Sequence, residues 1–412
     1  MKHELKRLLS FDEALGKVLA ESSRHILDSE GCEVSESLNR VLREDVYAPS
    51  DVPQADNSAM DGYCVKHSDV ASAKPDKPIQ LPICGYIDAG HPLESLSAGS
   101  AAYIATGGML PAGADCVIKI EDIEKSHTGN EILVKSAPPL GTYIRLKGKD
   151  FKKGEKVVSS GEVISPFLMG VLASQGLPTF RVSRRPRVAV ITSGDEIVMP
   201  FEDPKPWQVR NANSYILSGQ IAQAGGIPMD FGIMPDDPKQ AEKAIQRALQ
   251  LCDLVVTSGG ISMGNRDPFI AALRNLNAEE IVHEVAIKPG KPFYFGTLDG
   301  KPIFGLPGNQ ASSAVTFELF VRPFLTRIQS WKNPDRLSIW LPLKEASVNK
   351  TDRDHFARAR IVSKSGRTYA EPLENQASHM LTSLIGVQLL VRHAARIPRL
   401  DAEQIVECKL IM

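Results

Sequence analysis

The chain has 412 residues, of which 42% are hydrophobic and 24% charged, a balance typical of a globular protein with more than one domain. Its 48 basic and 49 acidic residues leave a formal net charge of −1, so no global field would draw it to nucleic acid or to an anionic membrane. The N-terminal stretch lacks the apolar core of a signal peptide, and no later run approaches about 18 apolar residues. We therefore expect a cytoplasmic protein.

The spacing of cysteines and histidines argues against a disulfide framework or a zinc site. The six cysteines form no CxxC pair, and the nine histidines form no HxxxH or HExxH pair. Any metal ion bound here should therefore have oxygen ligands.

The first 182 residues predict helices on either side of a β-rich segment. Ser10 and Glu13 fit a capping box at the start of a helix, and residues 35–42 suggest a second helix. Residues 51–149 contain short apolar stretches broken by Pro, Gly and Asp, which predict an inserted β-rich domain. Residues 162–175 look helical again. We assign residues 1–50 and 150–182 to one N-terminal helical and linker domain.

The region 183–331 alternates strand and helix patterns, which predicts an α/β domain around a parallel sheet. One of its helices should begin with Asp237 as N-cap and Pro238 at the first position, and a long apolar helix at 310–328 should close the domain. Residues 332–412 show β-branched stretches and no helical stripe. They predict a small C-terminal β-barrel or sandwich.

Polar residues follow two strands of the predicted α/β domain. Ligands of open α/β sheets bind beyond the carboxyl ends of the strands, and glycines there leave amide N–H groups free for a phosphate. A tight turn with hydroxyl caps would explain the first group equally well. The residues are Ser258, Gly259, Gly260 and Ser262 after one strand, and Pro307, Gly308 and Asn309 after the other.

Three acids, Glu196, Asp236 and Asp267, also follow predicted strands. If they converge, each pair about 5 Å apart repels by roughly 3 kcal/mol at an effective dielectric near 20. A divalent cation bound between the carboxylates would replace this repulsion by attraction. Taken singly, Asp236 could be a helix cap and Glu196 a surface residue.

Two lysines flank a stiff turn in the same region. Lys288 and Lys291 enclose Pro289-Gly290, and two ammonium groups held in this way make a receptor for a tetrahedral oxyanion. A solvated turn between strands is the alternative. Asp150 lies in a basic, glycine-containing stretch that is either a phosphate contact or a solvated charge run, and Asp61 precedes Gly62 in what could be an ordinary β-turn.

Taken together, these motifs resemble the MoeA family of molybdopterin molybdenumtransferases, whose eukaryotic relatives include the gephyrin E domain. The resemblance covers essentially the whole chain and rests on six motifs in order. They are DNSAMDGY, ATGGMLPAGAD, SGDEI, TSGGISMG continuing to Asp267, AIKPGKP and GLPGN.

The resemblance implies a four-domain, elongated homodimer whose α/β domain is similar to the molybdopterin adenylyltransferases. It implies that the substrates are molybdate and adenylylated molybdopterin, that molybdenum is inserted into the dithiolene, and that AMP is released with Mg²⁺. Candidate partners are a molybdopterin adenylyltransferase and maturation proteins of molybdoenzymes. Neither nucleic acid nor membrane is expected.

The resemblance also assigns roles to individual residues. Asp61 would act from the β-rich insert of one subunit on the α/β domain of the other. Lys288 and Lys291 would hold anionic ligand, while Arg358 and Ser378 would contribute to a molybdate pocket. The family's acids for catalysis and magnesium match Asp61, Glu196, Asp236 and Asp267, and further positions important for activity match Thr106 and Asp150.

This chain departs from the family pattern at two positions. Glu284 stands where the family usually has a basic residue, and Gln310 stands where it usually has a proline. A negative charge at position 284 would weaken anion binding. The leading hypothesis is a molybdenum insertase; the alternatives are a molybdopterin adenylyltransferase and a noncatalytic molybdopterin-binding scaffold homodimer, which Glu284 favours.

Overall fold

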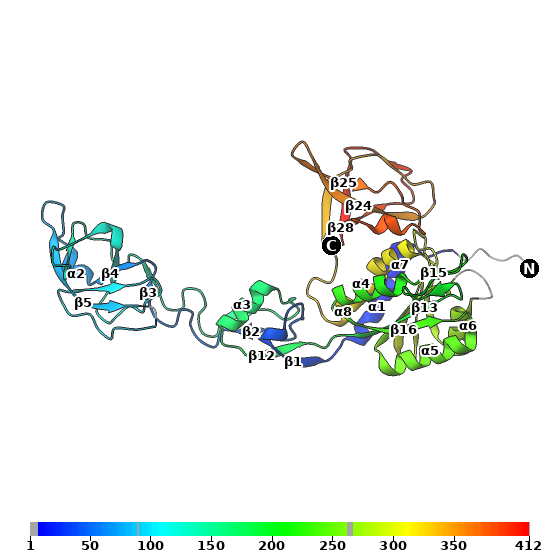
Figure 1. Ribbon diagram of the computed structural model, residues 1–412, viewed down its shortest axis with the longest axis horizontal. Helices are drawn as coiled ribbons and strands as arrows, with labels where there is room; N and C mark the ends of the chain where they lie inside the picture. The colour runs from blue at the N-terminus through cyan, green and yellow to red at the C-terminus, as the bar shows by residue number, and fades with distance from the viewer. Residues whose placement is uncertain (1–6, 89, 262–266, 412) are drawn as a thin grey trace, which may run out of the picture. The chain divides into compact units, whose positions relative to one another are not determined.

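Figure 1 shows the computed structural model, which describes residues 7–88, 90–261 and 267–411. The chain divides into two compact units. The first comprises Met1–Arg43, Gly161–Ser165 and Thr179–Met412, and the second comprises Glu44–Ser160 and Pro166–Pro178. None of the helices in the described ranges is both long and apolar enough to cross a membrane. The four-domain boundaries expected from the sequence remain a prediction.

A six-stranded sheet forms the centre of the first unit. Its strands, in spatial order, are β16 (Ile227–Met234), β13 (Arg187–Ser193), β17 (Leu254–Ser258), β21 (Lys301–Leu306), β20 (Tyr294–Leu298) and β18 (Glu279–His283). The first four are parallel, as the alternating pattern predicts; β18 is antiparallel to β20, and β20 is antiparallel to β21. The tight turn at Asp299 and Gly300, both with positive φ, explains this, because so short a connection can join only antiparallel strands.

Helices cover both faces of this sheet. Alternate residues of β13 enter different cores: Val188 and Val190 belong to one, and Ala189 and Ile191 to the other. Strands buried on both faces read as continuous apolar runs. The first core packs α1 (Phe11–Ser22), α4 (Asn213–Gln223), α7 (Gln310–Thr316) and α8 (Arg322–Ile328), and the second packs α5 (Pro238–Leu251) and α6 (Pro268–Asn275).

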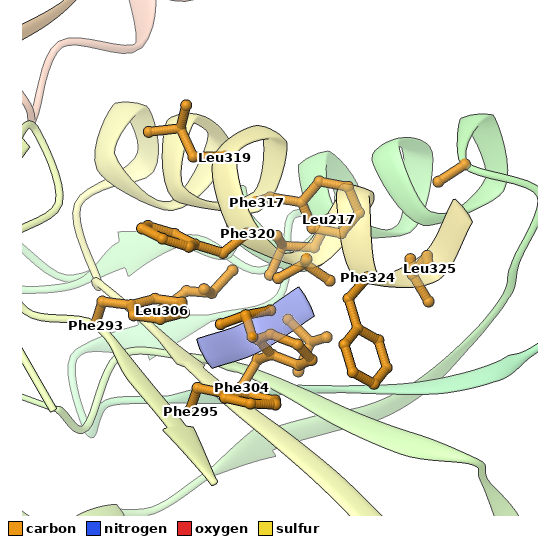
Figure 2. Packing of buried hydrophobic residues seen from close by; sticks show 14 of the residues in the cluster. Leu217, Phe293, Phe295, Phe304, Leu306, Phe317, Leu319, Phe320, Phe324 and Leu325 are labelled. Carbon is orange, nitrogen blue, oxygen red and sulfur yellow. The ribbon is translucent and has the colours of Figure 1, made fainter. Parts of the chain in front are cut away.

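The first core is rich in phenylalanine. Figure 2 shows rings from the strand side facing rings from the helix side, including Phe304 opposite Phe324. Their ring centroids lie 5.3 Å apart in an edge-on arrangement, and such aromatic pairs add stability beyond their buried area. This packing holds the helices firmly against the strands that carry the site described below.

Most predicted helix ends are confirmed. Ser10 and Glu13 form the capping box of α1, and Asp237 caps α5 by accepting a hydrogen bond from the amide of Gln240 at 2.8 Å. The helix predicted at 310–328 contains a π-helical turn at Phe317–Val321. Pro323 lies just beyond that turn and has no N–H to donate to the preceding turn, which accounts for the irregularity.

The prediction of a helix at residues 35–42 is wrong. Only a single 3₁₀ turn forms, at Val34–Glu36. Asn39 adopts a φ of +61°, which a right-handed helix does not allow. Residues Ser29–Glu33 instead form β1, which pairs with β12 (Thr179–Ser183), a strand distant in sequence.

The C-terminal region is built on a second sheet, with no helix among its described residues except the 3₁₀ turn Leu381–Leu384. An isolated bridge joins Leu343 to Ala370, but the strand ladders do not close a ring, so the barrel remains a prediction. The sheet's order is β19 (Ile287–Lys288), β24 (Asp354–Lys364), β26 (Leu389–His393), β28 (Ile405–Leu410) and β22 (Ser338–Pro342), with β25 (Arg367–Pro372) paired to β24.

The second unit contains the β-rich segment predicted at residues 51–149, together with residues 44–50, 150–160 and 166–178 that the sequence analysis assigned to the N-terminal domain. Its six-stranded sheet has the order β7 (Cys116–Lys119), β4 (Gly62–Val65), β6 (Ala101–Ile104), β5 (Ile79–Ile87), β9 (Glu131–Val134) and β8 (Ile123–Lys125). Two smaller pairs join β3 (Asn57–Ser58) to β10 (Ile144–Arg145) and β2 (Val46–Tyr47) to β11 (Lys156–Val158). The unit also contains α2 (His67–Val70) and α3 (Pro166–Ser174), the second of which confirms the predicted helix.

Candidate active site

A cavity of about 1310 Å³ opens at the carboxyl ends of the parallel strands of the first unit. Ligands of open α/β sheets bind at this end. Its walls come from the segments that follow β13, β16, β17 and β21, from the turn after β19, and from the loop 376–379 of the C-terminal region. Chain segments far apart in sequence thus contribute to one site.

Most of the residues predicted for the first unit line this cavity. They are Glu196, Asp236, Gly259, Gly260, Asp267, Lys288, Lys291, Pro307, Gly308, Asn309 and Ser378. Ser258 and Arg358 do not line it, and Ser262 lies outside the described residues. Asp61, Thr106 and Asp150 belong to the second unit.

Two glycines bring the loop after β17 close to β13. Gly259 and Gly260 have φ values of +88° and +69°, a region that residues with a Cβ rarely adopt. A Cβ at position 259 would lie 2.4 Å from the carbonyl oxygen of Ser193. The neighbouring Ser258 hydroxyl is fully buried and donates to the carbonyl of Pro307 at 3.2 Å, so it holds the two loops together.

Two of the three acids are fixed by local hydrogen bonds, and the third lies in an exposed turn. The Ser193 hydroxyl donates to Oδ1 of Asp236 at 2.9 Å. Asp267 is the N-cap of α6, where its Oδ1 accepts from the amides of Phe269 and Ile270 at 3.2 and 3.4 Å. Glu196 lies in the exposed turn after β13.

The acids share the cavity without forming a preformed metal cage. Among the residues that the structure describes, no group of three or more His, Cys, Asp or Glu side chains is placed to hold a metal ion. The donors are nevertheless of the type that Mg²⁺ prefers, because this ion commonly uses one or two carboxylates and completes its shell with water and substrate phosphates. The carboxylates of Glu196 and Asp236 fit that mode of binding.

The two predicted lysines supply positive charge to the wall of the same cavity. Lys288 ends β19, which pairs in parallel with β24. Lys291 forms an ion pair with Glu284 at 3.7 Å. The residue that departs from the family pattern therefore contacts one of the two predicted anion-binding lysines, and it partly offsets that lysine's charge. Arg353, which the sequence did not single out, adds another cation to the cavity wall.

Two asparagines are the main site residues that sequence reasoning missed. Asn211 and Asn213 are buried and line the cavity at the start of α4. Asn213 donates from Nδ2 to Ser258 Oγ at 2.6 Å and to the carbonyl of Gly308 at 2.7 Å. Asn213 Oδ1 and Asn211 Nδ2 are buried and lack a partner among the described residues. Buried polar atoms are normally paired, so these two are candidates for a hydrogen bond to a bound ligand.

Arg358 acts behind the cavity wall. Its side chain is fully buried, and burial lowers its pKa to about 10. The guanidinium donates to the carbonyls of Asn375 and Ala377 at 3.3 and 3.4 Å. It thereby holds the loop that presents Ser378, whose hydroxyl accepts a hydrogen bond from Asn309 at 3.3 Å.

In the second unit, Asp61 and Thr106 form a hydrogen-bonded pair. Oδ1 of Asp61 accepts from the amide of Thr106 at 2.6 Å and from its hydroxyl at 2.7 Å. These two bonds, the amide's first, lower the pKa of Asp61, so its carboxylate is ionised at neutral pH. Asp150 lies on a separate loop, where its amide donates to the carbonyl of Val52 at 2.9 Å.

Thr106→Val is expected to raise the pKa of Asp61, because it removes the hydroxyl donor and leaves the amide donor in place. A lowered pKa in the folded state stabilises the protein at neutral pH, and this contribution is lost as the pH falls through the folded-state value. Titration of the Asp61 carboxyl carbon by NMR measures the change. Thr106→Ser, which keeps a hydroxyl, is the control; equal pKa values in the valine and serine variants would contradict the expectation.

Family comparison covers most of the chain. Residues 9–176 match the MoeA N-terminal region (domain I and II), residues 189–327 match the probable molybdopterin binding domain, and residues 341–386 match the MoeA C-terminal region (domain IV). The three matches follow in the order that the sequence motifs imply.

Whole-chain relatives agree with these matches. The molybdopterin molybdenumtransferase of Synechococcus elongatus is 34% identical over 385 residues, which cover 92% of this chain and 93% of that protein. The enzyme of the same name from Haemophilus influenzae is 33% identical and covers 92% of both chains. A solved MoeA structure from Pyrococcus horikoshii superposes with a TM-score of 0.81 at 32% identity and covers 98% of this chain and 99% of that one. The protein therefore belongs to the MoeA family.

Proposed function

We propose that this protein inserts molybdenum from molybdate into adenylylated molybdopterin and releases AMP in a magnesium-dependent reaction. This is a step of molybdenum cofactor biosynthesis, in keeping with the name molybdopterin molybdenumtransferase that its relatives carry. The observation that carries the proposal is a single cavity in which Lys288 and Lys291 lie with Glu196, Asp236 and Asp267. Such a site accommodates two anions and a cation at once.

The anionic groups of both substrates have matching contacts in the cavity. Lys288 and Lys291 supply point charges for a tetrahedral oxyanion. The amino end of α4, at Ala212 and Asn213, also lines the cavity, and its helix dipole favours a phosphate. Asn211 and Asn213 retain buried amide atoms without partners among the described residues, ready to orient the pterin nucleotide.

The acids would serve the magnesium-dependent cleavage that releases AMP. Glu196 and Asp236 would hold magnesium, with Asp267 contributing beside its role as the cap of α6. The bound ion would offset the negative charge of the pyrophosphate while water cleaves the phosphoanhydride bond and AMP leaves. In the same overall reaction two Mo–S bonds form at the dithiolene, and the two thiol protons leave with one oxide of molybdate as water, so that one Mo–O bond is broken.

Asp61 would complete the site from a second copy of the chain. Its ionised carboxylate is held by two hydrogen bonds from Thr106 and is therefore preorganised. In this proposal the protein is a homodimer, and Asp61 of one subunit serves the cavity of the other. A cytoplasmic location belongs to the same proposal, supported by six cysteines that are all free thiols.

The activity is tested with purified protein, adenylylated molybdopterin, Mg²⁺ and molybdate, by measuring AMP and formed cofactor. Molybdate-dependent release of AMP supports the proposal. ATP consumption with molybdopterin would instead identify an adenylyltransferase, and no turnover with either substrate would identify a molybdopterin-binding scaffold. The adenylyltransferase that supplies the substrate and the maturation proteins that receive the product are the proposed partners.

Asp61→Ala is expected to abolish molybdate-dependent AMP release without changing the oligomeric state, because the residue lies in an exposed loop of the second unit. The AMP-release assay measures the activity, and sedimentation velocity measures the oligomeric state. Asp76→Ala removes an equal charge from an exposed turn of that unit and should leave turnover unchanged. Full activity of the Asp61 variant would remove this residue from the mechanism.

Mixing two inactive variants tests whether subunits share the site. Asp61→Ala and Lys288→Ala chains, mixed and allowed to exchange, should recover roughly a quarter of the normal activity, because half of the dimers are mixed and each has one intact site. AMP release by the mixture is the measurement, and each variant alone is the control. A mixture as inactive as its components, with exchange shown by sedimentation of tagged chains, would place both residues within one subunit's site.

Glu284→Gln is expected to tighten molybdate binding by about fivefold, corresponding to about 1 kcal/mol, since Lys291 loses the carboxylate that offsets its charge. Isothermal titration with molybdate measures the affinity. Glu280→Gln is a matched control, because Glu280 lies on the neighbouring strand β18 and does not line the cavity. Equal affinities in the two variants would show that Glu284 has no influence on the anion.

A further inference from the structure

A second hollow opens at the opposite end of the same sheet. Its volume is about 630 Å³, and its walls include Arg187, Ile227 and Lys301, the first residues of β13, β16 and β21. The active-site cavity lies beyond the other ends of these strands. The seven residues of β13 therefore separate the two hollows by about 20 Å.

This hollow carries an excess of positive charge. Five cations line it, against the carboxylates of Glu30 and Asp253, which leaves a net charge of plus three. The cations are Arg40, Arg184, Arg185, Arg187 and Lys301. The whole chain has a net charge of −1, so this concentration of positive charge is local.

Both carboxylates are already engaged. Asp253 accepts two hydrogen bonds from the guanidinium of Arg184, at 2.8 and 2.9 Å, and a third from the amide of Arg187 at 2.7 Å. Glu30 pairs with Arg40. Neither acid forms a described ion pair with Arg185, Arg187 or Lys301. The charge of Glu30 acts on Arg185 and that of Asp253 on Lys301, so the carboxylates offset these cations only in part.

Two of the remaining cations are held in place by neutral carbonyl groups. Arg185 donates from Nε to Gly225 at 3.1 Å and from Nη2 to Gly226 at 2.9 Å. Lys301 donates to the carbonyls of Leu249 and Cys252 at the end of α5. The negative end of this helix dipole, equivalent to about half a charge, offsets only part of the excess. Burial, and then the charge of Arg40, lower the pKa of Arg185, while the charge of Glu30 opposes this shift.

The third cation is exposed. No described contact engages the side chain of Arg187, which lies at the wall of the hollow, and Arg40 has a buried Nε atom without a described partner. Guanidinium groups bind phosphate oxygens through paired hydrogen bonds. A volume of this size exceeds that of one phosphate and falls within the range of small-ligand sites.

We propose that this hollow is a second ligand site, which binds a phosphate-bearing small molecule through Arg185, Arg187 and Lys301. Its ligand is anionic and carries more than one phosphate group, since three fixed or available cations face it. Ile227 and Leu251 give the hollow an apolar edge that suits the organic part of a nucleotide. The site is separate from the active-site cavity and does not depend on the proposed reaction.

Isothermal titration of the full chain with inorganic pyrophosphate tests the proposal. The titration uses a Lys288→Gln, Lys291→Gln background so that binding in the active-site cavity is suppressed. Saturable binding that weakens with added salt is expected, and Arg187→Glu should weaken it by about tenfold or more. Arg24→Glu makes the same charge change on an exposed side chain outside the hollow and should leave the affinity unchanged.

Three results would overturn the proposal. They are no binding at millimolar pyrophosphate, equal affinity in the Arg187 and Arg24 variants, and a change in sedimentation caused by Arg187→Glu without a change in affinity, which would assign the cations to a protein interface. Arg187→Gln replaces Arg187→Glu if the latter unfolds, as judged by circular dichroism. A parallel titration with ADP distinguishes two kinds of ligand. If ADP binds more tightly than pyrophosphate, the ligand is a nucleotide; if ADP binds equally or more weakly, the ligand is free pyrophosphate.

Discussion

The burial of the central sheet on both faces is the constraint on which the rest of the structure depends. Alternate residues of β13 enter two separate cores, and helices cover each of them. Because both faces of the inner strands are covered, these strands meet ligands at their ends, whereas the edge strands β16 and β18 also carry exposed residues. The carboxyl ends carry the active-site cavity and the amino ends carry the cation-lined hollow. The packing of the helices on the sheet thus determines where ligand sites can form.

Within the active-site cavity, opposite charges coexist because each is tied to its own segment. Asp267 is fixed by capping α6, and Asp236 accepts a hydrogen bond from Ser193. Lys291 is held by Glu284 from the loop that follows β18. The contacts described for the acids and for Lys291 therefore come from different segments of the chain, which places both kinds of charge at the wall of one cavity.

Much of this could be predicted from local sequence signals. The capping box of α1, the cap of α5 and the polar residues beyond the parallel strands follow from rules that act over a few residues. The rest depends on contacts between distant segments. The strand β1 exists because β12 pairs with it, and the buried role of Ser258 depends on Asn213 and Pro307. Asn213 itself resembles any polar residue at a helix start, and the second hollow is assembled from segments that share no motif.

The placement of Lys288 on β19 has a mechanical consequence. This two-residue strand is hydrogen-bonded to β24, so the backbone of the lysine is part of the C-terminal sheet. The strands before and after β19 in the chain, β18 and β20, belong to the sheet of the α/β domain. Rotation of that sheet would carry the ammonium group with it. The backbone position of Lys288 at the cavity wall therefore depends on its pairing with β24 as well as on the α/β domain.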